Sequence, residues 1–274
     1  MTSKRRLGFL GIGPFLFGLT LALASQARGS ELPSHQSWTQ LLAACVAATA
    51  DGHSTAVDYA CFADRREALQ TYLDALSAVP SASFQASSRD ARLAFLINAY
   101  NAWTVELILT AWPDLKSIRD LGSLLRSPWK RAFVPLFGDT LSLDDIEHGM
   151  IREPGRYDEP RIHFAVNCAS IGCPALRREA YTEAELEAQL EDQTRRFLAD
   201  PSRNRVAGPY LEVSSLFKWY GSDFEQGWRG TDSVEGFLAR YAGALGIDSD
   251  GARKLTEGAY GLRFLDYDWS LNKR

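Results

Sequence analysis

The stretch RDARLAFLINAYNAWTVELILTAW, residues 89–112, has the longest helical pattern of the chain. Its apolar residues recur every three or four positions and form a broad face: Leu93, Leu96, Ile97, Tyr100, Val105, Ile108 and Leu109. Because the stretch is apolar almost all round, we expect a central, buried helix rather than a surface one. Pro113 follows the stretch and predicts the end of this helix.

Helical patterns also precede this stretch, whereas strand patterns come mostly after it. Further helices are expected at residues 38–50, 59–80, 142–151, 182–198 and 234–245. Strands are expected at residues 132–137, 140–143, 161–166 and 262–269, with a hairpin at 206–213. This order favours a single α+β domain, with N-terminal helices packed on a mostly antiparallel sheet. An arrangement like that of papain or the transglutaminases is one form of such a domain.

The composition is that of a globular protein with one large domain or two small ones. The chain has 274 residues, of which 46% are hydrophobic and 23% charged, so disordered and fibrous classes are excluded. Its net charge of -4 and its pI of about 5.7 argue against a dedicated nucleic-acid-binding protein. We therefore expect no nucleic-acid partner.

The N-terminus has the pattern of a secretory signal peptide over residues 1–27. Basic residues at 4–6 precede an apolar, uncharged run at 7–24, and small residues suited to cleavage follow. Cleavage would leave residues 28–56 as a linker and first helix and residues 57–272 as the main domain. We expect a periplasmic or secreted protein without stable membrane insertion after cleavage.

The four cysteines all lie beyond this segment, and export to an oxidising compartment would favour disulfides among them. Four cysteines allow three connectivities. Pairing of neighbours in the sequence would join Cys45 to Cys61 and so staple two helices. It would also join Cys168 to Cys173 and close a small loop.

Two asparagines, Asn98 and Asn101, interrupt the apolar stretch and share one face of the expected central helix. Buried amides require hydrogen-bond partners. The pair therefore either holds a neighbouring loop in place or orients a catalytic histidine.

A second polar cluster lies where Glu147, His148 and Arg152 fall within about one helical turn. A histidine titrates near neutral pH and can act as a general acid or base. His148 is thus either a catalytic residue or a surface histidine beside a solvated acid.

The segment RIHFAVNCASIGCP, residues 161–174, has the densest set of reactive residues. As a strand it would place Arg161 and His163 on one face, which is costly to bury unless it lines a cleft. Cys168 follows, and a protonated histidine nearby would favour its thiolate. The alternatives are a Cys168–Cys173 disulfide and a zinc site shared with two histidines. The cysteine spacing is loose for zinc, so we expect no metal and no other cofactor.

Near the C-terminus, Asp266 and Asp268 flank Tyr267 on an expected strand and so share one face. Such an acid can orient a histidine, as in a catalytic triad. The alternative is that the two acids bind backbone amides or an arginine and fix the end of the chain.

Together these segments resemble the DUF547 family, a family of domains of unknown function, in its exported bacterial branch. The resemblance extends over residues 57–272 and rests on the motifs VDY (57–59), AFLINAYN (94–101), LDDIEH (143–148), RIHF (161–164), CAS (168–170), GCP (172–174) and DYDWSLN (266–272). It implies no settled activity. It does imply a shared site with these members: Asn98, Asn101, Glu147, His148, His163, Cys168 and Cys173. Cys45 and Cys61 lie outside the family pattern.

Two functions fit these residues. The first is a thiol enzyme that performs acyl transfer or amide hydrolysis on a small molecule, a peptide or an envelope polymer. Cys168 or Cys173 would be its nucleophile, and His148 or His163 would be its base, oriented by an Asn or Asp. The second is a non-enzymatic binding module of the cell envelope, with a permanent Cys168–Cys173 disulfide, a buried polar network and an aromatic groove at residues 217–228. A free, low-pKa thiol would distinguish the first from the second.

Overall fold

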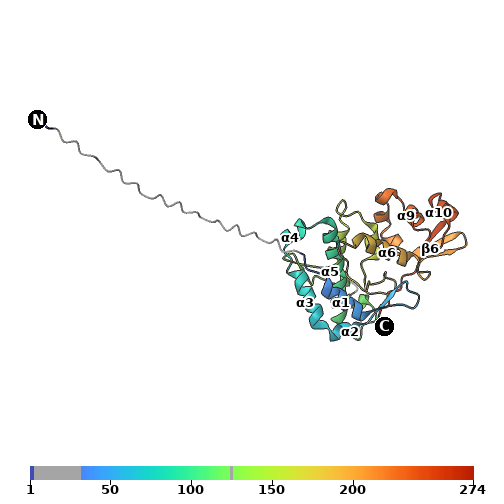
Figure 1. Cartoon of the computed structure of the whole chain (residues 1–274). Coiled ribbons are helices and arrows are strands. Elements are labelled where there is room, and N and C mark those ends of the chain that lie inside the picture. Colours follow the sequence, from blue (N-terminus) through green and yellow to red (C-terminus); the bar gives the residue numbers. More distant parts are fainter. Residues whose placement is uncertain (3–31, 124–125) are drawn as a thin grey trace.

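The computed structural model describes residues 1–2, 32–123 and 126–274 (Figure 1). The signal peptide predicted at residues 1–27 therefore lies almost wholly outside the described residues. Within the described ranges, no helix combines the length and the apolar character that are needed to cross a membrane.

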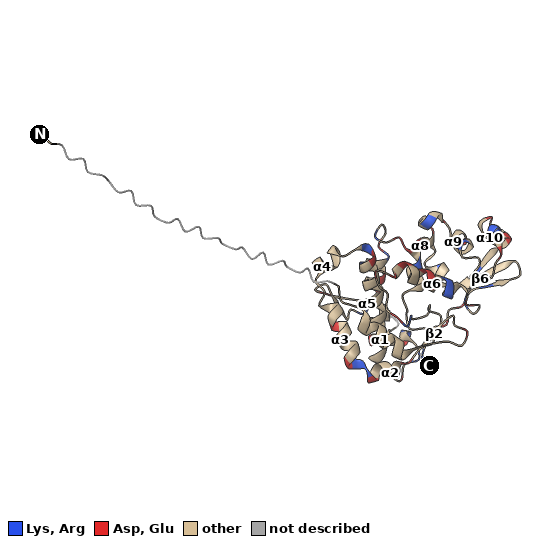
Figure 2. Cartoon of the chain, viewed as in Figure 1, with Lys and Arg blue, Asp and Glu red and all other residues tan. Residues whose placement is uncertain are grey.

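The N-terminal part consists of helices packed around a central one, α5 (Arg89–Leu109). The others are α1 (Gln36–Cys45), α2 (Tyr59–Asp64), α3 (Arg66–Ser77) and α4 (Ser81–Ala86). Ser88 caps α5 by accepting a hydrogen bond from the backbone N–H of Ala91 at 3.1 Å. The middle of α5 carries no charged side chain (Figure 2) and is buried along nearly its whole length, so the predicted central helix is confirmed.

The first helix is shorter than the one predicted. It ends at Cys45, and the chain continues as β1 (Val46–Ala48), which pairs antiparallel with β2 (Thr55–Val57). Between the strands, Gly52 has a φ of 75°, a left-handed conformation that glycine adopts without strain. A disulfide from Cys45 to Cys61 joins α1 to α2, as the pairing of neighbours predicts.

Two further small sheets lie in the second half of the chain. β3 (Val134–Leu136) and β4 (Asp139–Leu141) form an antiparallel hairpin, as predicted. β5 (Arg205–Ala207) pairs antiparallel with β6 (Tyr210–Ser214), which pairs parallel with β7 (Gly261–Leu265). The α+β class is confirmed, with the strands of the described residues divided among three small sheets.

Short helices connect these strands and cover them. They are η1 (Ile118–Leu121), η2 (Pro128–Lys130), the π-helix η3 (Asp145–Ile151), η4 (Pro160–Phe164), α6 (Leu186–Leu198), α7 (Leu216–Trp219), α8 (Gly221–Phe224), η5 (Trp228–Gly230), α9 (Val234–Arg240) and α10 (Ser249–Thr256). The helices predicted at 182–198 and 234–245 are present as the shorter α6 and α9. The buried apolar side chains form two clusters, one around α5 and the other around α9 and β6.

The strand predicted at residues 161–166 is wrong, because the segment begins as the 3-10 helix η4. Pro160 favours a helical start, since its ring fixes φ and it lacks the N–H that a strand ladder would use. The Glu159 side chain then accepts a hydrogen bond from the backbone N–H of Arg161 at 3.2 Å. Arg161 and His163 therefore do not share the face of a strand.

His35, just before α1, couples the stability of the helical part to pH. Its Nδ1 lies 2.7 Å from the Tyr72 hydroxyl, and burial lowers the pKa of His35 from 6.5 to about 4. Below its ordinary pKa the unfolded chain binds a proton that the folded chain does not, so acidification favours unfolding. We expect the free energy of unfolding to fall by roughly 1–3 kcal/mol from this residue between about pH 7 and pH 4.

Urea denaturation at a series of pH values measures this loss. The variant His35→Gln keeps a polar partner for Tyr72 but cannot titrate, so its stability should depend less on pH over the same range. An unchanged pH dependence in the variant would contradict the assignment to His35.

Candidate functional site

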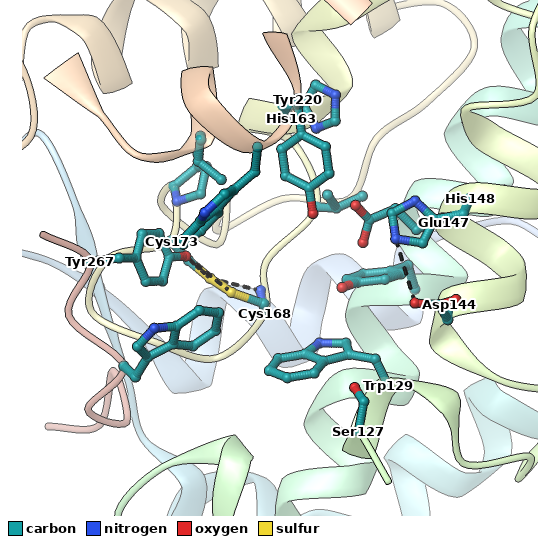
Figure 3. Close-up of a pocket in the computed structure, with 16 residues that line it drawn as sticks. Ser127, Trp129, Asp144, Glu147, His148, His163, Cys168, Cys173, Tyr220 and Tyr267 are labelled. Atoms are coloured by element: carbon teal, nitrogen blue, oxygen red, sulfur yellow. Dashed lines mark hydrogen bonds and ion pairs between the residues drawn. A yellow bond between two sulfur atoms is a disulfide. The ribbon is translucent and has the colours of Figure 1, made fainter. Parts of the chain in front are cut away.

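A cavity of about 180 Å³ lies between the two hydrophobic clusters (Figure 3). Its walls come from α5, η2, η3, η4, α7 and the segments that follow η4 and β7. Six aromatic side chains line it: Tyr100, Trp129, Trp219, Tyr220, Tyr267 and Trp269. The wall also contains these ionisable and cysteine side chains: Asp144, Glu147, His148, His163, Cys168 and Cys173. Five members of the site that the sequence motifs imply therefore meet in one cavity.

Cys168 and Cys173 form a disulfide in the cavity wall. The Tyr267 hydroxyl lies 3.2 Å from each sulfur, and the Ser170 hydroxyl lies 3.2 Å from Cys168 Sγ and 3.3 Å from Cys173 Sγ. Cys173 Sγ also accepts a hydrogen bond from the backbone N–H of Cys168 at 2.9 Å. All four cysteines lie in the described ranges and all are paired, so this is an oxidised form without a free thiol.

The zinc alternative does not fit this oxidised form. The sulfurs of Cys168 and Cys173 are bonded to each other, and zinc binds cysteine as a thiolate. Over the described part of the chain, no group of three or more His, Cys, Asp or Glu side chains is placed to hold a metal ion.

Asn98 and Asn101 do not line the cavity but bind backbone groups of the segments packed on α5. The Asn101 amide donates to the Ala165 carbonyl at 3.0 Å and accepts from the Asn167 N–H at 2.8 Å. Asn98 makes the same pair of bonds to the backbone of Tyr181, at 2.7 and 3.0 Å. Of the two alternatives for this pair, the geometry corresponds to holding neighbouring segments: Asn101 holds the one that leads to the disulfide, and Asn98 the one before α6.

The acid that orients His163 is Asp223 of α8. His163 Nε2 donates to Asp223 Oδ2 at 2.8 Å, and Arg152 donates to both oxygens of the same carboxylate, at 2.6 and 2.9 Å. Although burial acts in the opposite direction, these hydrogen bonds hold the pKa of Asp223 well below its usual value. Because Nε2 carries the proton in this arrangement, Nδ1 of His163 is the nitrogen that can accept one.

Tyr220 fixes the plane of the same imidazole. The rings of His163 and Tyr220 are stacked with their centroids 4.1 Å apart, and the Arg152 guanidinium lies 4.6 Å from the Tyr220 ring. Burial lowers the pKa of His163 against the opposing effect of Asp223, so the imidazole is neutral at neutral pH. A neutral imidazole held in one tautomer is suited to accept a proton as a general base.

Glu147 on η3 supplies a buried negative charge, since the residue is only 6% exposed. Its carboxylate and the Tyr220 hydroxyl point toward each other (Figure 3). Burial, together with the charge of Glu147 and a hydrogen bond to it, raises the pKa of both Tyr100 and Tyr220. Two phenol groups thus solvate this carboxylate without neutralising it.

His148 lies on the exposed side of the cavity. Its Nδ1 accepts a hydrogen bond from Arg152, and its Nε2 lies 3.5 Å from Asp144 Oδ1 (Figure 3). Of the two histidines considered as a base, His163 is the one that is buried and oriented by an acid.

Arg161 does not reach the cavity. Its side chain is 1% exposed and donates to both oxygens of Glu159 and of Glu187, on the side of η4 that faces α6. The Trp228 ring covers the guanidinium at 4.8 Å. This network fixes η4 against α6 and thereby helps to hold His163, which lies on η4, in position.

The two C-terminal acids lie outside the cavity wall. Asp266 and Asp268 are exposed, and Asp268 accepts a hydrogen bond from the Ser270 N–H at 2.8 Å, which corresponds to the backbone-binding alternative for this acid. Tyr267, between them, is the residue that reaches the disulfide. Gly172 permits this approach, because a Cβ there would lie 2.9 Å from the Tyr267 ring.

Three residues of the site, Asp223, Trp129 and Trp269, are not among those that the sequence predicts. Asp223 could have been noticed, because it is an acid within the aromatic segment 217–228, where a binding groove is predicted. Trp269 lies in the DYDWSLN motif, whereas Trp129 has no such signal, because aromatic residues are as common in cores as in binding sites.

Comparison with models of protein families matches residues 84–198 to the family described as "Protein of unknown function, DUF547". Comparisons with curated proteins and with solved structures gave no match. The matched segment contains α5, η3, η4 and the disulfide loop, and so every residue of the site that the resemblance implies. The match confirms the predicted resemblance to the DUF547 family over residues 84–198.

Proposed function

We propose that this protein is an exported enzyme that transfers or hydrolyses acyl groups through a cysteine thiol. One observation carries the proposal: two cysteine sulfurs and a histidine oriented by an acid, His163 with Asp223, converge on one cavity. A nucleophile, a base and an orienting acid are the parts used by thiol hydrolases. The N-terminal pattern and the two disulfides support export to an oxidising compartment. The acyl substrate would be a small molecule, a peptide or an envelope polymer.

Cys168 is the better nucleophile of the pair. It is partly exposed, whereas Cys173 is 2% exposed. A dithiol reductant would open the disulfide by attack on Cys168 Sγ, and Cys173 would leave as a thiolate. The Cys168 N–H and the Tyr267 hydroxyl both donate hydrogen bonds to Cys173 Sγ in the disulfide, and the same donors would stabilise the thiolate. The reaction ends with two thiols in the protein and one disulfide in the reductant.

The reduced site contains the groups that each proton transfer requires. His163 Nδ1 takes the proton of the Cys168 thiol, and the thiolate attacks the carbonyl carbon of an amide or ester. The leaving amine or alcohol receives that proton from the imidazolium as a thioester forms. Water or a second amine then attacks the thioester, passes a proton through His163, and Cys168 regains its thiol. Asp223 stabilises the imidazolium in both halves of the cycle.

A binding module without catalysis is the second candidate, and the closed disulfide favours it. In that case Cys168 and Cys173 would remain permanently bonded and would brace the loop after η4. The cavity would then serve only to hold a ligand against its aromatic walls.

Alkylation with iodoacetamide, before and after treatment with dithiothreitol, distinguishes these candidates. Peptide mass spectrometry gives the reaction rate at Cys168 separately from those of the other cysteines. We expect Cys168 to react only after reduction, with a rate midpoint below about pH 7.5, in contrast to about pH 8.5 for an ordinary thiol. The matched control is the same protein unfolded in guanidinium chloride, where Cys168 keeps its sequence neighbours but loses His163.

The variant Cys173→Ser tests which sulfur is the nucleophile. Its Cys168 has no partner in the loop and should react rapidly without any reductant. A native disulfide that resists dithiothreitol, or a midpoint for folded Cys168 as high as in the unfolded control, would rule out the thiol enzyme and leave the binding module.

A further inference from the structure

The titratable side chains of the cavity wall include two carboxylates and two histidines. Glu147 and Asp144 line it, and among the described residues of its wall there is no lysine or arginine. Arg152 lies nearby, but Asp223 binds it through both carboxylate oxygens and balances its charge. His163 is buried and neutral at neutral pH, because burial lowers its pKa. His148 lies 3.5 Å from Asp144, so the negative charge that these groups do not balance is that of Glu147.

Glu147 is the centre of this charge. Its partners are the hydroxyls of Tyr100 and Tyr220, and no basic side chain in the described ranges forms an ion pair with it. The Arg152 guanidinium interacts with the charge of Glu147, but Asp223 binds it through both oxygens, so Glu147 is only partly balanced. A buried carboxylate that is only partly balanced is costly in free energy. A cation that entered the cavity would remove that cost.

A cluster of aromatic rings forms another part of the cavity wall. Trp219 and Trp269 are stacked with centroids 5.7 Å apart, and Tyr267 lies 4.9 Å from the first ring and 4.6 Å from the second. Trp129 meets Trp269 edge-on at 5.7 Å. Trp219 is 44% exposed, whereas the Arg119 guanidinium already lies 5.2 Å from the Trp269 ring, so Trp219 and Tyr267 are the rings left for an incoming ligand.

We propose that the cavity binds an organic cation, a protonated amine or a quaternary ammonium group, between these rings and Glu147. Aromatic faces attract such cations through their quadrupole, and a nearby carboxylate adds Coulomb attraction. The volume of about 180 Å³ suits a small ammonium group. The proposal deepens the proposed function, because the cation would be the amine side of the acyl substrate, and it rests on that function for this role alone.

A neutral ring, such as that of a sugar, is the main alternative occupant, because aromatic side chains also stack on neutral rings. The two occupants differ in their need for Glu147. A cation depends on the negative charge, whereas a neutral ring depends only on the aromatic surface.

Binding of tetramethylammonium and of tert-butanol, a neutral molecule of similar size, tests the proposal directly. The protein is kept oxidised, the ionic strength is held constant with sodium chloride, and binding is followed by calorimetry and tryptophan fluorescence. We expect tetramethylammonium to bind at least about tenfold more tightly than tert-butanol. The closed disulfide excludes thiol chemistry, so this test measures cation binding alone. Failure to bind the cation would leave the proposed thiol enzyme standing, and failure of the thiol test would leave cation binding standing.

Three variants locate the binding group. Glu147→Gln, which keeps an acceptor for the tyrosines, should remove most of the preference for the cation. Trp219→Leu, at a half-exposed position, should weaken tetramethylammonium binding about fivefold or more. Glu225→Gln changes an exposed acid that does not line the cavity and should have no effect.

Equal affinities for the two probes, or no measurable binding of tetramethylammonium, would overturn the proposal. So would a Glu147→Gln variant that folds and keeps the preference. If that variant does not fold, Trp219→Leu and the rim variant Asp144→Asn decide the outcome, and unchanged binding in both would equally count against it.

Discussion

Replacing Asn101 with leucine is expected to lower the free energy of unfolding by about 2–5 kcal/mol. Asn101 is 3% exposed, and its amide binds the Ala165 carbonyl at 3.0 Å and the Asn167 N–H at 2.8 Å. Leucine has nearly the same shape but can neither donate nor accept, so both backbone groups would remain buried without a partner. Each such group costs about 1–3 kcal/mol.

Urea denaturation followed by tryptophan fluorescence measures this loss. Gln70→Leu is the control, since it also replaces a helical amide by leucine but at an exposed position on α3. It should change the stability by no more than about 0.5 kcal/mol. A loss below about 1 kcal/mol for Asn101→Leu would mean that the two backbone groups find other partners.

Replacing Asp223 with asparagine is expected to slow alkylation of reduced Cys168 at neutral pH by about 10–100-fold. The carboxylate accepts the Nε2 proton of His163 at 2.8 Å, so it sets the tautomer and stabilises the imidazolium that forms beside a thiolate. An amide can do neither reliably, and it also leaves Arg152 without a charged partner. The rate of carbamidomethylation of Cys168 after dithiothreitol treatment is the measurement.

Asp144→Asn is the matched control, because Asp144 is the acid beside the other histidine, His148. Its effect on the rate should stay within about twofold. The opposite ranking of the two variants would assign the role of base to His148.

Acid denaturation adds a second readout for Asp223. Its pKa is lowered in the folded protein, so its stabilising contribution is complete above the ordinary value of about 3.9 and is lost as the pH falls below it. Asp223→Asn should lack this component. An acid-denaturation curve identical to that of the unchanged protein would contradict the ion-pair network at α8.

The elements that were predicted correctly have local causes. α5 follows from thirteen consecutive uncharged residues, 93–105, which leave the helix no charged side to expose. The β3–β4 hairpin follows from Gly138 between apolar runs, although its loop is Phe137–Gly138 and Asp139, expected in the turn, begins β4. The prediction of a strand at 161–166 is wrong for a local reason as well. Apolar residues alternate there, but Pro160 favours the start of a helix.

The cysteine pairing was predictable in part. Both disulfides join cysteines that are close in sequence, Cys45 to Cys61 and Cys168 to Cys173, so short loops made these pairings the natural choice. Their presence could be anticipated from the spacing and the export pattern. That Tyr267 would cover the second disulfide could not, because it lies more than ninety residues away from both sulfurs.

Residue types and short-range patterns thus sufficed for the fold class, the central helix, the candidate cysteine pairs and a set of reactive residues. The partners of those residues came only from the folded chain: Asp223 for His163, backbone groups for Asn98 and Asn101, and two tyrosine hydroxyls for Glu147. Helix and strand propensities act over a few residues, whereas His163 and Asp223 are 60 residues apart. Contacts at that separation are selected by the packing of the whole chain, since many acids could reach a given histidine and only the complete core decides which one does.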